Sequence, residues 1–295
     1  MIEAFINTLE FFPRGLVYVG LGLVILLLAK VSNDLMTPHR IDEEIVGKSN
    51  TAIALGLSGY FAGVILVFAG AVFQPLTVAV NDGLGFNLEF GADVVRVLLY
   101  SLAGIVALNL SRILMDRLVL FKFSVQKELV EDQNVGTAAV EFGMQVAIGL
   151  LIAGAISGSG GGPDTALAFF GMGLVVLILF ALFYDLTTPF SIHDEIEKNN
   201  TAVGVALGGN LIAIGLVMLK AVFGDFVGWG ASIVEFLTFA VIGFVLLYVL
   251  RLLIDLVLLP SIKVSDALAV ERNVGVAFIE STVVIGAALI LFFAI

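Results

Sequence analysis

Long apolar stretches alternate with short polar connections along the whole chain of 295 residues. A helix needs roughly 20 mostly apolar residues to cross a bilayer. Eight stretches reach this length: 14–34, 50–73, 93–120, 134–157, 167–187, 200–223, 232–259 and 273–295. The pattern therefore predicts an all-α polytopic membrane protein with eight transmembrane helices.

Polar signatures recur at the ends of these stretches, which predicts repeated units. An aspartate stands near the end of every odd-numbered stretch, and an asparagine begins every even-numbered one. They are Asp34, Asp116, Asp185 and Asp255, and Asn50, Asn134, Asn200 and Asn273. We expect four helical hairpins of one plan, grouped as two four-helix repeats at 1–160 and 161–295. Repeats with an even number of spans share one orientation, so their symmetry axis runs along the membrane normal.

The connections between paired stretches are not plain loops. Segments 41–46 and 192–197 mix acidic and apolar residues at helical spacing. Ser191 with Asp194 resembles a capping box at a helix start. These connections are predicted to form short interfacial helices on the membrane surface.

Composition agrees with a membrane protein and narrows its chemistry. The chain is 60% hydrophobic and 13% charged, whereas soluble domains average about 25% charged residues. A net charge of −11 argues against nucleic acid as a partner. With no cysteine and two histidines, no metal site or cofactor is expected. No hydrolytic or nucleotide-binding motif occurs, so we do not expect an enzyme.

Basic residues predict the orientation. Eleven of the 14 Lys and Arg residues lie in or beside the connections after helices one, three, five and seven. The positive-inside rule places those connections in the cytoplasm. Both termini of an eight-helix chain are then extracytoplasmic.

Two glutamates enter the apolar stretches. Glu141 and Glu280 each follow a helix-starting asparagine by seven residues, which places them about 10 Å inside the helix. Arg112 and Arg251 lie about 12 Å inside the antiparallel helices that precede them. We therefore expect Arg112 to pair with Glu141 and Arg251 with Glu280, because buried charges are tolerated when they are paired.

Asp116 and Asp255 stand one helical turn from the two arginines and would complete two charge clusters. Each cluster is either a clamp that holds one hairpin together or part of a functional site. In the second interpretation the clusters face one another across the pseudo-two-fold axis and line a path for protons or cations.

The asparagines and histidines each have a structural interpretation and a functional alternative. The four asparagines are expected to cap helices, with a selectivity or binding role as the alternative. His39 and His193 are expected to be solvated connector residues, with pH sensing as the alternative.

The run Asp194-Glu195-Ile196-Glu197-Lys198-Asn199-Asn200-Thr201-Ala202, continued to Gly209, resembles the signature of the YjfL-like family of bacterial inner-membrane proteins, domain of unknown function 350. Residues 42–59 resemble it less closely, and tandem hairpins extend the resemblance over nearly the whole chain. The second and fourth hairpins depart from the Asn-Thr-Ala form. The resemblance implies a bacterial inner-membrane protein and brings no catalytic residue.

Together these observations favour a small transport or permeation protein with a proton or cation site at Glu141 and Glu280. The alternative is a non-transporting scaffold that recruits a cytoplasmic protein through its acidic connections. Lipid handling in a groove between the halves is a third option. Besides the lipid bilayer, a second copy of the chain is an expected partner, because a hairpin-repeat protein can pair through its glycine-rich faces into a symmetric dimer.

Overall fold

The computed structural model describes residues 2–37, 39–73, 88–158 and 160–295. Within them, long helices form at all eight predicted stretches, and each is long and apolar enough to cross a membrane. They are α1 (Ile2–Met36), α2 (Thr51–Phe73), α3 (Leu88–Leu118), α5 (Val135–Ile156), α6 (Pro163–Thr187), α8 (Thr201–Val222), α9 (Trp229–Leu253) and α11 (Val274–Ala294). The prediction of an all-α fold with eight spans is confirmed.

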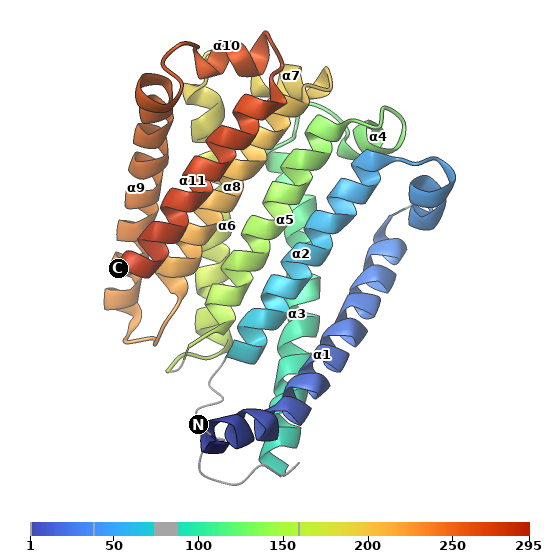
Figure 1. Cartoon of the computed structure of the whole chain (residues 1–295), viewed down its shortest axis with the longest axis vertical. Helices are drawn as coiled ribbons and strands as arrows, with labels where there is room; N and C mark the ends of the chain where they lie inside the picture. The colour runs from blue at the N-terminus through green and yellow to red at the C-terminus, as the bar shows by residue number, and fades with distance from the viewer. Residues whose placement is uncertain (1, 38, 74–87, 159) are drawn as a thin grey trace.

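Short helices join the two helices of each hairpin, all at one end of the molecule (Figure 1). They are the π-helical turn η1 (Glu43–Gly47), α4 (Val125–Val130), α7 (Ile192–Glu197) and α10 (Val264–Ala269). A second π-helical segment, η3 (Ile254–Leu258), continues α9. The sequence pattern predicted η1 and α7 but missed α4 and α10. We call this end of the molecule the short-helix side.

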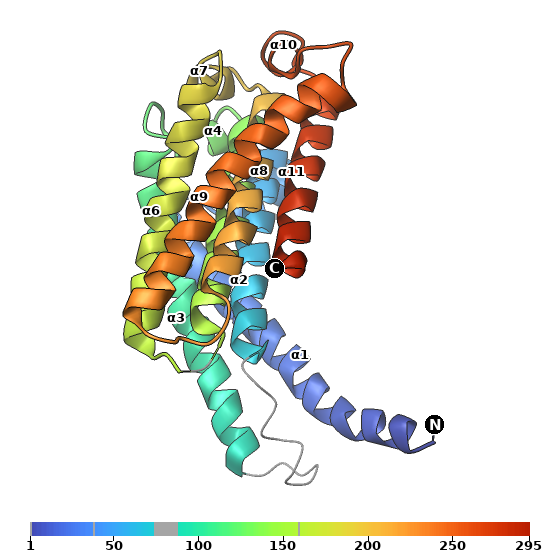
Figure 2. The same cartoon turned by 90° about the vertical axis from the view of Figure 1, so that its left-hand side faces the viewer.

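The second helices of the four hairpins form a row in the order α2, α5, α8, α11 (Figure 1). The first helices form another layer: α3 contacts α2 and α5, α6 contacts α5 and α8, and α9 contacts α8 and α11. Figure 2 shows α3 and α6 on the side away from α11. The fold is thus a linear array of hairpins.

Glycines set the close spacing inside the row. A Cβ on Gly143 would overlap the Gly208 backbone, and one on Gly204 would overlap Gly136. Burial of apolar surface drives no association in lipid, so helices associate through such close contacts. As a result α5 and α8, in the middle of the row, are almost wholly buried.

Every helix of the row begins in the same way. The residue before each starting asparagine has φ between 48° and 56°, namely Ser49, Gln133, Asn199 and Arg272. The asparagine Oδ1 then accepts a hydrogen bond from the backbone N–H three residues later. All four asparagines are therefore helix caps.

Candidate functional site

One ion pair joins the two helices of the second hairpin. Arg112 Nε on α3 lies 3.0 Å from Glu141 Oε2 on α5, and the Glu141 side chain is only 1% exposed. Arg112 Nη1 also donates to Asn33 Oδ1 at the end of α1, at 3.3 Å. The structure therefore brings together Arg112 and Glu141, which the rise per residue of a helix places at a similar depth in the membrane.

Asp116 completes this group, which we call the Arg112 cluster (Arg112, Asp116 and Glu141). The Asp116 carboxyl group lies close enough to interact electrostatically with both Glu141 and Arg112. One oxygen of each, Oδ1 and Oε1, is buried without a hydrogen-bond donor among the described residues. Because an ionised carboxylate can only accept hydrogen bonds, these two carboxyl groups can share a hydrogen bond only when one of them carries a proton.

A cavity of about 160 Å³ opens beside the Arg112 cluster on the short-helix side. Its polar lining includes Asn33, His39 and Asn109 as well as Arg112 and Asp116. Burial lowers the pKa of His39 below its usual value, so at neutral pH this histidine adds no positive charge to the cavity. The cluster therefore has a polar approach from one side of the molecule.

The fourth hairpin does not reproduce this arrangement, so the predicted pairing of Arg251 with Glu280 is wrong. Among the described residues, no ion pair joins them. Glu280 Oε1 instead accepts hydrogen bonds from Tyr184 Oη on α6 and Asn210 Nδ2 on α8, both at 3.2 Å. We call Glu280, Tyr184 and Asn210 the Glu280 cluster. The second glutamate oxygen, Oε2, is buried with no donor among the described residues.

An exchange of two residue types explains the difference. Tyr184 occupies the position of Asn33 in the repeat, and Asn210 occupies that of Tyr60. The small Asn33 leaves Arg112 free to reach Glu141. In the second half, the guanidinium carbon of Arg251 lies over the Tyr184 ring, 5.1 Å from the ring centre. The Tyr184 hydroxyl donates a hydrogen bond to Glu280. Arg251 donates to Thr188 instead, at 2.7 Å.

The two clusters also do not face one another. Helix α8 stands between α5 and α11 and packs against both, as Gly208 against Gly143 and Gly209 against Ser281 show (Figure 1). The expected single path between Glu141 and Glu280 across a pseudo-two-fold axis is therefore wrong. Each glutamate belongs to a separate polar group.

The four signature aspartates have different roles. Asp255 Oδ1 accepts a hydrogen bond from Val264 N at the start of α10, at 2.8 Å, and Asp185 Oδ1 accepts one from Ile192 N, at 3.3 Å. Both fasten a short helix to the end of a long one. Asp116 turns towards Glu141 instead, and Asp34 is exposed.

His193 is buried, which contradicts its prediction as a solvated connector residue. Its Nε2 lies 2.7 Å from the Val119 carbonyl oxygen and its Nδ1 lies 3.5 Å from Asp185 Oδ2. His39 is partly buried against the Arg112 cavity.

The asparagine amides form ties between hairpins that sequence reasoning missed. Asn134 Nδ2 donates to the Ile196 carbonyl of α7 at 2.6 Å, and Asn200 Nδ2 donates to the Leu268 carbonyl of α10 at 2.9 Å. Asn50 makes the same bond to Leu129 of α4. Each asparagine thus caps its own helix and holds the short helix of the next hairpin.

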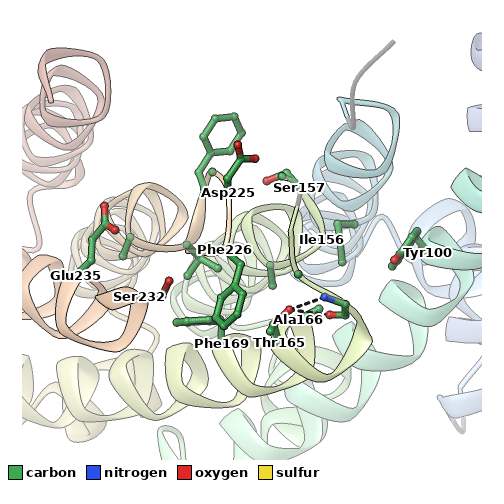
Figure 3. Close-up of a pocket in the computed structure, with 18 residues that line it drawn as sticks. Tyr100, Ile156, Ser157, Thr165, Ala166, Phe169, Asp225, Phe226, Ser232 and Glu235 are labelled. Atoms are coloured by element: carbon green, nitrogen blue, oxygen red, sulfur yellow. Dashed lines mark hydrogen bonds between the residues drawn. The ribbon is translucent and has the colours of Figure 1, made fainter. Parts of the chain in front are cut away.

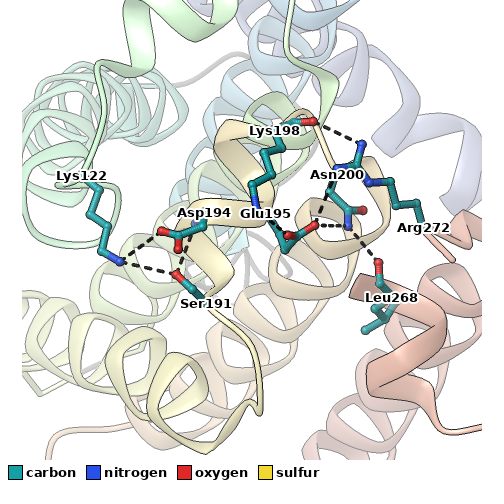
Figure 4. Close-up of polar contacts among 8 residues, drawn as sticks. All are labelled: Lys122, Ser191, Asp194, Glu195, Lys198, Asn200, Leu268 and Arg272. Atoms are coloured by element: carbon teal, nitrogen blue, oxygen red, sulfur yellow. Dashed lines mark hydrogen bonds and ion pairs between the residues drawn. The ribbon is translucent and has the colours of Figure 1, made fainter. Parts of the chain in front are cut away.

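Three glutamates support these ties and were also missed. Glu128 accepts from Asn134 and Glu195 from Asn200, at 2.7 and 3.0 Å, and Glu44 contacts Asn50. Burial raises the pKa of Glu195, but the Asn200 amide, Lys198 and Arg272 outweigh it and hold the pKa below its usual value (Figure 4). The signal was a glutamate five or six residues before three of the asparagines.

A second polar cavity, of about 80 Å³, lies at the opposite end of α5 (Figure 3). The turns that follow α5 and α8 form it, and its lining includes Ser157, Asp225 and Glu235. None of the residues predicted from the sequence lines it.

No group of three or more His, Asp or Glu residues in the described part of the chain is arranged to hold a metal ion. The fold and its buried carboxyl groups define the class: an integral membrane protein built from helical hairpins, with ionisable groups inside the bundle.

The chain belongs to the family described as Domain of Unknown Function (DUF350), whose model matches it twice, over residues 7–156 and 160–295. It is 21% identical over 255 residues to a UPF0719 transmembrane protein of Aquifex aeolicus, which covers 85% of this chain and 88% of the relative. It is 27% identical over 119 residues to the UPF0719 transmembrane protein YshE of Bacillus subtilis, covering 40% of this chain and 84% of the relative.

A shorter match of 80 residues, 30% identical, is with the UPF0719 inner membrane protein YjfL of Escherichia coli K12 and covers 25% of this chain and 61% of the relative. No solved structure matches the chain. The resemblance seen in residues 194–209 is thus confirmed at the level of the family.

Proposed function

We propose that the protein is a small transport or permeation protein that takes up a proton or another small cation at the Arg112 cluster. The observation that supports this proposal is that two carboxyl groups, Glu141 and Asp116, share one guanidinium, Arg112, beside a polar cavity that Arg112 and Asp116 line. One guanidinium against two carboxylates leaves one negative charge when both acids are ionised. A bound proton or monovalent cation neutralises that charge, which a low-dielectric interior favours.

The residues of the cluster then have distinct roles. Asp116, in the cavity lining, receives the cation first, and the buried Glu141 shares it. Arg112 keeps one carboxylate charged and holds α3 against α5. Glu280 is a second acceptor, with Tyr184 and Asn210 as its hydrogen-bond donors.

The proposal includes an orientation and excludes catalysis. The short-helix side faces the cytoplasm of a bacterial inner membrane, because basic residues gather there, and both termini are extracytoplasmic. The Arg112 cavity then opens towards the cytoplasm. No catalytic role is assigned to any residue.

Ion flux into liposomes tests the proposal. A dye that reports internal pH, read under an imposed potassium diffusion potential, should show faster acidification with the wild type than in protein-free vesicles. The same assay with an internal sodium dye covers the other cation. Glu141→Gln preserves the shape and the acceptor for Arg112 but removes the ionisable group, so its flux should fall to the protein-free level.

Glu235→Gln is the matched control, because it removes an exposed carboxylate of α9 far from the cluster. Its flux should equal that of the wild type. Equal flux for Glu141→Gln and wild type would reject the Arg112 cluster as the site. Wild-type flux at the protein-free level would favour the scaffold instead.

The scaffold proposal, recruitment of a cytoplasmic protein by acidic connections, has less support from the contacts. Several connector acids are already paired within the chain: Asp42 with Lys30, Asp132 with Lys127, and Asp194 with Lys122. These contacts, of which Figure 4 shows the pair of Asp194 with Lys122, reduce the negative charge left for a partner.

A further inference from the structure

One packing contact recurs between successive hairpins. In α3, α6 and α9, a glycine stands twelve residues before the signature aspartate. A side chain from the second helix of the preceding hairpin packs against this glycine, so there is no room for a Cβ. The pairs are Gly104 with Val67, Gly173 with Leu151, and Gly243 with Val217, where Ile214 also approaches the glycine. Each of these side chains also stands at one fixed interval after its starting asparagine, so the contact is the same at all three junctions.

The first hairpin carries the same glycine, but the three atoms nearest to the place of its Cβ all belong to Phe68 of the same hairpin. Gly22 precedes Asp34 by the interval that separates Gly104 from Asp116. It lies in an apolar groove of about 290 Å³ between α1 and α2, where the Phe68 ring comes within 3.3 Å of the place that a Cβ would occupy. One end of the row therefore presents an empty copy of the internal junction.

The other end of the row presents the matching side chain. Ile290 of α11 follows Asn273 by the same interval at which Val67, Leu151 and Val217 follow their own asparagines. Those three residues are 0–1% exposed, whereas Ile290 is 70% exposed. The groove at Gly22 and the side chain of Ile290 thus correspond to the two sides of the contact that forms at each internal junction.

The polar tie between hairpins is also left open at both ends. The amides of Asn50, Asn134 and Asn200 each donate to a carbonyl of the next short helix. Asn273 is exposed, and its amide has no acceptor among the described residues. At the start of the row, the Ile45 carbonyl of η1 occupies the position of the three acceptors, one residue after Glu44.

We propose that a second copy of the chain continues the row, with α11 of one protomer seated in the α1–α2 groove of its partner. Ile290 then packs on Gly22 of the partner subunit, and Asn273 donates to the carbonyl of Ile45 of the partner subunit. Ile65 stands in α2 where α5 and α8 carry Gly149 and Gly215, so the two helices lie farther apart than within the chain.

The contact joins two different surfaces, so it is heterologous: repetition closes a ring or extends a row. A symmetric contact of α11 with α11 is the competing arrangement. The two arrangements bring different residues of the two protomers together, and cross-linking distinguishes them.

Cysteine cross-linking in native membranes tests the proposal cleanly, because the chain has no cysteine. Two differently tagged forms, Gly22→Cys and Ile290→Cys, are co-expressed and treated with a short bis-maleimide. A product of twice the chain mass that carries both tags is expected. Neither form expressed alone should give a cross-linked product.

The internal junction supplies the positive control and a neighbouring position the negative one. A Leu151→Cys/Gly173→Cys chain should cross-link within itself. Val175→Cys, at a similar depth on the exposed face of α6, should give no product with Gly22→Cys. Self-cross-linking of Ile290→Cys, or no mixed product when the internal control reacts, would overturn the proposal.

A second variant tests the groove without cross-linking. Gly22→Trp places an indole in the groove, where Phe68 supplies the three atoms nearest to an added Cβ. Native mass spectrometry of the wild type should show a species larger than one chain, and this species should be lost in Gly22→Trp while the thermal unfolding temperature is kept. Persistence of the larger species in Gly22→Trp would overturn the proposal.

Discussion

Replacing Arg112 by leucine should lower the free energy of unfolding by about 3–5 kcal/mol, the usual cost of breaking a buried ion pair from one side. The change leaves Glu141, 1% exposed, and Asp116 together without a positive charge. Thermal unfolding in detergent at neutral pH, followed by helical circular dichroism, measures the effect.

Arg251→Leu is the matched control, because Arg251 occupies the same repeat position without an ion pair to Glu280. It should cost less, about 2 kcal/mol, mainly for the charge-assisted hydrogen bond to Thr188 and with a smaller part for the contact with the Tyr184 ring. Equal losses for the two variants would show that the ion pair in the Arg112 cluster adds nothing to stability.

The second large effect is expected at Asn134. Asn134→Ala should cost about 3 kcal/mol, since it removes a helix cap and leaves the buried Glu128 and the Ile196 carbonyl without their donor. Chemical unfolding of the purified protein reports the loss.

Asn273→Ala removes the same cap at the end of the row, where the amide makes no tie within the described part of the chain. In a monomeric preparation it should cost about 1 kcal/mol. If the two alanine variants unfold alike, the amide ties between hairpins do not stabilise the array.

The helices and the first cluster could be predicted because their signals are local. Span length, helix-starting asparagines and helix rise are enough to place Arg112 beside Glu141. Those signals treat the two halves as equal, so they also predicted an Arg251–Glu280 pair. The outcome there depends on Tyr184, which comes from a different hairpin, and no local pattern shows that its ring separates the two charges.

The spatial arrangement of the hairpins could not be predicted from the sequence, for a related reason. Two four-helix repeats can be arranged as facing halves or as a continuous row, and both bury the same apolar stretches. The choice depends on contacts such as Gly143 with Gly208, which join α5 of the first half to α8 of the second. Helix spacing along the chain contains no information about such a contact.

The claim that Asp116 and Glu141 share an exchangeable proton or cation is tested most directly by infrared spectroscopy of the purified protein in lipid. At neutral pH and without added cations, the wild type should show the C=O band of a protonated carboxyl group. That band should shift promptly in heavy water, because the cavity admits solvent to Asp116, and should be absent in Asp116→Asn and in Glu141→Gln. A spectrum in which the wild type and both variants show the same carboxyl bands would contradict the account.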